Sequence, residues 1–393
     1  MGFIRSERVA AFLLLAAAAL GLILANTGIG PALMELQDAH LAIPGTPLDL
    51  SVGHWISDGL LAVFFFVVAV ELKNELTVGQ LNSVSKAVRP AIAALGGVIV
   101  PALVYLAVTA GSGYAGGWPV PTATDIAFAL GVLAVFGKGI PSRLRIFILA
   151  LAILDDIVAI IIIAVFFTAD PNLLYIGLAA IGVAAFGLLS HLLSTRYQTL
   201  AAVAMVAVAL TTWSLVYLSG VHATIAGVAL GLIMVRKPAM HVRHQLEPAT
   251  NGVILPLFAF SAALVAIPQV APSQLAAPFW GILIALPVGK IIGISIGGWL
   301  SSFVGPRERR PNLTPQALLT AGALGGVGFT VSLLMNELAF VNNPEVADEG
   351  TLAVLLGSSI SIIASAFLVS RLAAYYKRLR LLREDAHRRL TSP

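Results

Sequence analysis

Hydrophobic runs of about 20 residues fill most of this chain and constrain its fold more than any other feature. Of the 393 residues, 59% are hydrophobic and 11% are charged, whereas a soluble domain is usually about a quarter charged. A helix of about 20 apolar residues crosses a bilayer. We therefore predict an all-α integral membrane protein with about 12 transmembrane helices. Their predicted ranges are 9–30, 56–72, 90–110, 121–137, 146–167, 173–193, 199–218, 220–235, 250–267, 278–303, 316–336 and 351–370.

Basic residues are distributed unevenly over the predicted connections, and this distribution gives an orientation. With a cytoplasmic N-terminus, the outer connections contain no Lys or Arg, and they contain acids such as Glu35, Asp170 and Glu345. The inner connections and the tails contain the basic residues, among them Arg5, Arg8, Lys73, Lys86, Arg89, Lys138, Arg145, Arg196, Arg236, Lys237, Arg243, Arg307, Arg309 and Arg310. This is the positive-inside pattern. It predicts cytoplasmic N- and C-termini, with residues 371–393 as a basic C-terminal tail.

Four ionisable side chains lie inside predicted spans, and they are the candidate functional residues. Asp155 and Asp156 are adjacent in LALAILDDIVAIIIIA, Asp125 lies in the fourth span, and Lys290 lies in the tenth. A charge at bilayer depth is unfavourable unless it is paired, protonated or bound to an ion of opposite charge. Neighbouring helix residues point about 100° apart, so the two adjacent aspartates face different surroundings. We predict that they bind a cation and that their affinity for protons is part of the function.

Two of the predicted spans contain residues that interrupt a helix. PTATDIAFAL begins with Pro121 and places Thr124 beside Asp125, and TAGALGGVGFT has four glycines within seven residues. These glycines are Gly322, Gly325, Gly326 and Gly328. They are also explained by close packing of helices through small residues, and this alternative stays open.

The interrupted spans are the fourth and the eleventh, which run in opposite directions. Each is the middle of a group of three spans, which is typical of inverted-topology repeats with two discontinuous helices. The broken ends carry partial charges, positive at N-termini and negative at C-termini. We expect Asp125 to balance the N-terminal ends and Lys290 the C-terminal ends.

Several motifs together resemble those of NhaA-type sodium/proton antiporters, over nearly the whole chain. They are TATDIAFALGVLA, LAILDDIVAIIIIA, SGVHATIAGV, ILPLFAF, GKIIGIS and GGVGFT. By this resemblance, Asp155 and Asp156 match the ion-binding pair of the family. Thr124 and Asp125 match residues of its first broken helix, and Lys290 matches its intramembrane lysine.

The resemblance implies a single transmembrane transporter domain over residues 1–393 in a bacterial inner membrane. The implied activity is electrogenic exchange of Na⁺ or Li⁺ for more than one H⁺, driven by the proton gradient and serving pH and sodium homeostasis. It implies no cofactor, no enzymatic reaction and no nucleic-acid partner. Family members commonly form homodimers through the loop after the first span, where Pro44 and Gly45 predict a hairpin turn.

The family also becomes active at alkaline pH, and here the match is partial. Glu71, Glu75 and His222 align with residues linked to that response. Asn74 stands where an arginine is expected and Arg243 falls near an expected acid, so we expect a shifted or weaker pH threshold. The alternative for the acids near the ends of the second span, which also include Asp58, is that they face an interface or a loop.

The alternative classes are an intramembrane protease, a channel and an antiporter for another cation. An intramembrane aspartyl protease needs two carboxyl groups about 3 Å apart sharing a proton, and consecutive helix residues diverge too far for this. A channel would place rings of acids along a pore and would not need interrupted helices of opposite direction. An antiporter for K⁺ or Ca²⁺ is the closest alternative, although Ca²⁺ usually takes about six to eight oxygen ligands.

Overall fold

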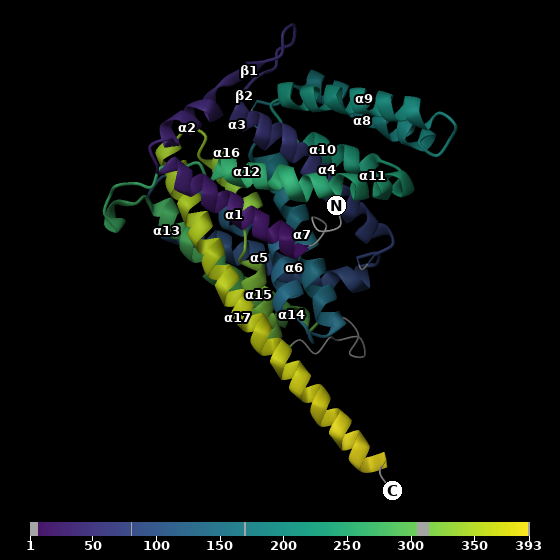
Figure 1. Cartoon of the computed structure of the whole chain (residues 1–393), viewed down its shortest axis with the longest axis vertical. Helices are drawn as coiled ribbons and strands as arrows, with labels where there is room; N and C mark the ends of the chain where they lie inside the picture. The colour runs from purple at the N-terminus through teal and green to yellow at the C-terminus, as the bar shows by residue number, and fades with distance from the viewer. Residues whose placement is uncertain (1–6, 80, 169, 305–313, 392–393) are drawn as a thin grey trace. The chain divides into compact units, whose positions relative to one another are not determined.

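The computed structural model describes residues 7–79, 81–168, 170–304 and 314–391, and most of them lie in helices (Figure 1). Arg5, Arg307, Arg309 and Arg310 of the predicted inner segments lie outside the described residues. The chain forms two compact units, which we call unit 1 (residues 1–82 and 160–268) and unit 2 (residues 83–159 and 269–393). Each unit combines two separate stretches of the chain, so neither is a contiguous sequence domain.

Unit 1 contains most of the N-terminal half and a short hairpin. Its elements are α1 (Glu7–Ala25), α2 (Gly30–Asp38), β1 (His40–Ala42), β2 (Asp49–Ser51), α3 (Val52–His54), η1 (Trp55–Leu60), α4 (Leu61–Thr77), α8 (Leu173–Leu192), α9 (Gln198–Leu218), α10 (Thr224–Ile233), α11 (Arg236–Ala249), η4 (Thr250–Ile254) and α12 (Leu255–Ala262). Helix α10 packs closely on α4, since a Cβ on Gly227 would overlap the carbonyl of Ala62. The segments η1 and η4 are π-helical turns.

The predicted hairpin turn is present after α2. Strands β1 and β2 are antiparallel, with His40 opposite Ser51. The amide of Thr46 donates to the carbonyl of Ile43 at 3.1 Å, and Gly45 between them has φ +79°. A type II turn requires positive φ at its third residue, here Gly45, and commonly has proline at its second, here Pro44.

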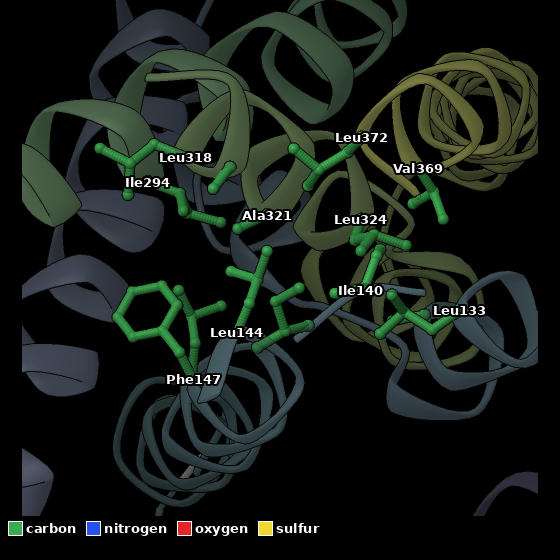
Figure 2. Close-up of a cluster of buried hydrophobic side chains, with 14 of the residues drawn as sticks. Leu133, Ile140, Leu144, Phe147, Ile294, Leu318, Ala321, Leu324, Val369 and Leu372 are labelled. Atoms are coloured by element: carbon green, nitrogen blue, oxygen red, sulfur yellow. The ribbon is translucent and has the colours of Figure 1, made fainter. Parts of the chain in front are cut away.

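Unit 2 contains the two interrupted segments. Its elements are α5 (Val84–Val108), η2 (Ala115–Gly117), η3 (Val120–Thr122), α6 (Ile126–Phe136), the start of α7 (Ser142–Phe166), η5 (Pro272–Gln274), α13 (Ala277–Ile284), η6 (Ala285–Gly289), α14 (Lys290–Ser301), α15 (Pro315–Gly325), α16 (Phe329–Ala339) and α17 (Pro344–Thr391). Figure 2 shows the apolar core that α6, α7, α14, α15 and α17 share. Leu133, Phe147, Ile294, Leu324 and Val369 represent these five helices in it.

The number of membrane spans differs in part from the prediction. Among the described residues, nine helices are long and apolar enough to cross a membrane, and the bent pair α15–α16 makes a tenth if it counts as one span. The predicted eighth span is a helix of only 10 residues, α10. The predicted ninth span belongs to a helical run that starts earlier, at Arg236, with a polar first half. The protein is therefore a multi-pass, helical membrane protein, and the count of twelve spans remains a prediction.

Helix α17 is longer than the predicted last span. Its 48 residues correspond to about 72 Å at about 1.5 Å per residue, more than twice the roughly 30 Å of a hydrocarbon core. The predicted C-terminal tail is thus continuous with the last helix as far as Thr391.

Candidate functional site

The start of α6 is set by its sequence. Ala123 and Asp125 are extended, with ψ of 156° and 104°, so the chain is not helical between η3 and α6. Asp125 is the N-cap of α6, and its Oδ1 accepts from the amide of Phe128 at 3.3 Å. Aspartate is among the best N-cap residues because its carboxylate accepts from the free amides of the first turn.

The glycine run in the eleventh predicted span ends one helix and begins another. Helix α15 ends at Gly325 and α16 begins at Phe329, with a bend of 52° between their axes. The same run also provides close packing, because a Cβ on Gly322 would lie 2.7 Å from the Cα of Ile291 on α14. The glycines therefore lie at a break between two helices and also allow close packing, while the discontinuous span remains a prediction.

Asp125 connects the N-termini of α6 and α16. Its Oδ2 accepts from the amide of Thr330 at 3.2 Å and from the hydroxyl of Thr330 at 2.6 Å. Its own amide donates to the carbonyl of Val327, between α15 and α16, at 2.6 Å. One buried carboxylate thus lies at two helix N-termini, where backbone amides and the helix dipole favour negative charge.

Lys290 and Asp155 are in direct contact. The ammonium of Lys290 donates to Oδ2 of Asp155, and both side chains are fully buried. The ammonium also donates to the hydroxyl of Thr124 at 3.0 Å. The second oxygen of Asp155, Oδ1, is buried and has no hydrogen-bond partner within the described part of the chain.

The hydroxyl of Thr124 lies between three groups. It faces Oδ2 of Asp155, it lies 2.8 Å from the carbonyl of Gly325 at the C-terminus of α15, and it accepts from Lys290. A hydroxyl carries one proton, so it donates either to Asp155 or to Gly325 at any one time. The hydrogen bonds of the structure therefore connect Lys290 to the C-terminal end of α15 through Thr124.

The helix that carries Lys290 is locally irregular. Lys290 follows the π-helical turn η6, and its amide donates to the carbonyl of Ala285, five residues earlier. Pro287 lies in this turn and has no amide proton to donate, which favours such a departure from regular α-helix. Gly97 on α5 leaves room beside the lysine, because a Cβ there would lie 2.7 Å from Ile294 and 3.8 Å from the lysine Cδ.

Asp156 is the next residue on α7 and is buried as well, with 8% of its surface exposed against 1% for Asp155. Two carboxylates, one ammonium and one hydroxyl thus come from α7, α14 and the segment before α6. Such a group offers carboxylate oxygens to a small cation or to protons, and either would compete with Lys290 for the charge of Asp155.

The residues linked by resemblance to the pH response lie in unit 1. Glu71 on α4 forms an ion pair with Arg243 on α11, with 3.0 Å between Oε2 and Nη2. Glu75 lies one turn further along α4 and is partly exposed. Lys73, between them in sequence, donates to the carbonyl of Met234 at 2.8 Å, beyond the C-terminus of α10.

His222 is held between two polar side chains. Its Nε2 lies 3.1 Å from Oδ1 of Asp58, and its Nδ1 lies 2.7 Å from the hydroxyl of Thr224. Asp58 is in the π-helical turn η1 and is buried, with 8% of its surface exposed, so its side chain does not face solvent. The indole of Trp213 donates to the Asp58 carbonyl at 2.9 Å. Sequence reasoning missed this pair because its members lie far apart in the sequence.

Comparison with known proteins gives a family. Residues 1–369 match the model of the family described as Na⁺/H⁺ antiporter 1. The chain is 59% identical over 371 residues to Na⁺/H⁺ antiporter NhaA 2 of Clavibacter michiganensis subsp. michiganensis, covering 93% of this chain and 91% of that relative. It is 46% identical over 378 residues to Na⁺/H⁺ antiporter NhaA of Tropheryma whipplei strain Twist, covering 94% and 95%. It is 45% identical over 401 residues to Na⁺/H⁺ antiporter NhaA of Streptomyces avermitilis, covering 98% and 84%.

Proposed function

We propose that this chain, which belongs to the Na⁺/H⁺ antiporter 1 family, exchanges Na⁺ or Li⁺ for protons across a bacterial inner membrane. The observation that carries the proposal is the buried pair of Lys290 and Asp155. One oxygen of this aspartate is bonded to the lysine, and the other has no partner among the described residues. The pair therefore leaves one buried carboxylate oxygen without a donor, and this oxygen is where a small cation would coordinate.

In the proposed cycle, Na⁺ enters from the cytoplasm and binds Asp155 and Asp156. It displaces the ammonium of Lys290 from Asp155 and any proton carried by Asp156. Lys290, without its counter-ion in a dry site, then loses a proton. On the outer side, Na⁺ leaves and the protons return. Because two groups release protons for one ion, the exchange ratio exceeds one proton per Na⁺ and the cycle moves net charge.

The ends of the interrupted helices support the same site. Asp125 compensates the N-termini of α6 and α16, and Thr124 with Lys290 compensates the C-terminus of α15. We propose that the fourth and eleventh of twelve spans are the discontinuous helices of an inverted repeat. The extended residues before α6 and the 52° bend between α15 and α16 support this proposal.

The pH response would reside in unit 1. Glu71, Glu75 and His222 are the proposed residues, and two contacts support a role for the first and the last. Glu71 is paired with Arg243, so the charge of α11 at this point is opposite to the family pattern. His222 bonds to Asp58, and histidine is the side chain whose charge most readily changes near neutral pH.

We further propose a homodimer with cytoplasmic termini. The hairpin of β1 and β2 follows α1 and α2, in the loop where family members commonly associate, and among the described residues neither strand pairs with a third. The positive-inside distribution of Lys and Arg supports the orientation.

Everted membrane vesicles test the function directly. Cells lacking their own antiporters would express the wild type, Asp156→Asn or the matched control Asp170→Asn, an exposed aspartate of a connection. After acidification of the vesicle interior, Na⁺, Li⁺, K⁺ or Ca²⁺ is added between pH 6.5 and 8.5. We expect Na⁺ and Li⁺, but not K⁺ or Ca²⁺, to make the vesicle interior more alkaline. This response should be present in the wild type and in Asp170→Asn and lost in Asp156→Asn. A response to K⁺ or Ca²⁺ would support the alternative antiporters, and no response to any cation would refute exchange.

A further inference from the structure

Helix α17 lies against the break between α15 and α16 through buried serines. Ser358 and Ser361 are both fully buried, and they are three residues apart, so they lie on the same face of the helix. Neither was singled out by its sequence. Their contacts differ, and this difference indicates two distinct roles.

Ser358 anchors the start of α16. Its Oγ accepts from the amide of Phe329 at 3.1 Å. Gly328, the N-cap of α16, has no side chain to accept the free amides of the first turn. Ser358 and Asp125 supply the missing acceptors from two other helical segments, at Phe329 and Thr330.

Ser361 faces the other side of the break and is unsatisfied. Its hydroxyl is buried and has no hydrogen-bond partner in the described residues. A Cβ on Gly326 would lie 2.7 Å from this hydroxyl, 2.9 Å from the carbonyl oxygen of Leu286 and 3.4 Å from that of Ala323. Three oxygens thus converge at the break. The carbonyl of Ala323 already accepts from the amide of Gly326.

The carbonyl of Leu286 belongs to the helix that carries Lys290. Leu286 lies in the π-helical turn η6, four residues before the lysine. Gly357 on α17 permits close approach to it, because a Cβ there would lie 3.3 Å from the Leu286 side chain. A movement of η6 would therefore change the packing against the face of α17 that carries Ser361. Single π-helical turns inside α-helices are frequent at functional sites.

We propose that Ser361 is a positioning residue of the exchange cycle, whose hydroxyl donates to the carbonyl of Leu286 in a second state of the break. This state forms when an ion opens the Lys290–Asp155 pair and η6 shifts. In the state seen here the hydroxyl has no partner among the described residues, which destabilises this state relative to one in which it is bonded. Ser358 holds α16 in place, so the movement is confined to η6 and the C-terminal end of α15. The inference rests on the proposed exchange function.

The test compares Ser361→Ala with Ser359→Ala in proteoliposomes. Ser359 is exposed and bonds only within α17, to the carbonyl of Leu355, which makes it a matched control. For Ser361→Ala we expect the maximal rate of Na⁺-driven proton movement to fall about fivefold, by loss of one hydrogen bond. The Na⁺ concentration for half-maximal rate should stay within twofold of wild type. The melting temperature without Na⁺ should not fall, because in that state the side-chain hydroxyl bonds to none of the described residues.

A second measurement follows the break itself. Na⁺ should change hydrogen exchange of the amides of residues 326–330 in the wild type and in Ser359→Ala, and this change should be lost in Ser361→Ala. A maximal rate of Na⁺-driven proton movement in Ser361→Ala equal to that of the wild type would overturn the positioning role. So would a lower rate that comes with a lower melting temperature, because that indicates a purely structural serine. Absence of Na⁺/H⁺ exchange in the wild type would instead overturn the proposed function, and this inference with it.

Discussion

Oδ2 of Asp155 is bonded to the ammonium of Lys290, while Oδ1 of the same carboxylate has no partner among the described residues. The pair is fully buried, so water does not screen it. An ion that reaches Oδ1 would weaken the hold of Asp155 on Lys290 through charge alone. The proposed exchange follows from this competition.

Removing the lysine should destabilise the protein through the carboxylate that it leaves behind. We expect Lys290→Met to lower the free energy of unfolding by about 3–5 kcal/mol, since it leaves a buried charge unpaired. The double variant Asp155→Asn with Lys290→Met should recover more than half of this loss. Thermal unfolding in detergent measures both. A double variant no more stable than Lys290→Met would show that the pair does not account for the loss.

The hydroxyl of Thr124 should matter more than the size of its side chain. Thr124→Val keeps the volume but leaves Lys290 and the Gly325 carbonyl each without one partner. We expect a loss of about 1–3 kcal/mol in unfolding free energy and weaker Na⁺ dependence of exchange. Thr124→Ser keeps the hydroxyl and should resemble the wild type in both measurements. Equal behaviour of the valine and serine variants would contradict a role for the hydroxyl.

Asp125 should stabilise two helix starts at once. Asp125→Ala removes acceptors from Phe128 and from Thr330, and caps of this kind each contribute about 1 kcal/mol. Faster hydrogen exchange is expected in the first turns of both α6 and α16. Asp125→Asn keeps an acceptor oxygen but not the charge, so it should protect the amides better than alanine does. Faster exchange at α6 alone would mean that Asp125 does not hold α16.

Replacing His222 should change the pH dependence of exchange. Nε2 of His222 bonds to Oδ1 of Asp58 and links the segment before α10 to η1, and a histidine takes up a proton near neutral pH more readily than other side chains do. His222→Gln cannot take up the proton, so its half-activation should lie at lower pH than that of the wild type. Flux measured from pH 6 to 9 decides this. His191→Gln, at the C-terminal end of α8, is the control, and an unchanged profile in His222→Gln would remove His222 from the response.

The sequence predicts those residues of the site whose charge is unfavourable inside a bilayer. Aspartates and a lysine in apolar runs identify Asp125, Asp155, Asp156 and Lys290, because a charge at that depth needs a partner. The Pro44–Gly45 turn is likewise predictable, since its conformation depends on two adjacent residues.

Pairings between distant segments could not be predicted in the same way. Asp58 with His222 and Glu71 with Arg243 depend on how helices pack, and hydrophobic periodicity does not specify this. Ser361 gives no signal at all, because serines are common in membrane helices and usually bond within their own helix. The eighth predicted span corresponds to the shorter helix α10, and the ninth is the later part of a helical run that begins with the polar α11, since the length rule for spans does not specify where a helix begins or ends.

Proton release on Na⁺ binding tests the central claim most directly. Purified protein in a weakly buffered solution at pH 8 would receive Na⁺ while the pH of the solution is recorded, with choline as the control cation. Competition of Na⁺ with protons and with Lys290 at Asp155 and Asp156 predicts more than one proton released per Na⁺ bound. Asp155→Asn and Asp156→Asn should abolish this release. Sodium binding to the wild type without proton release would contradict the account.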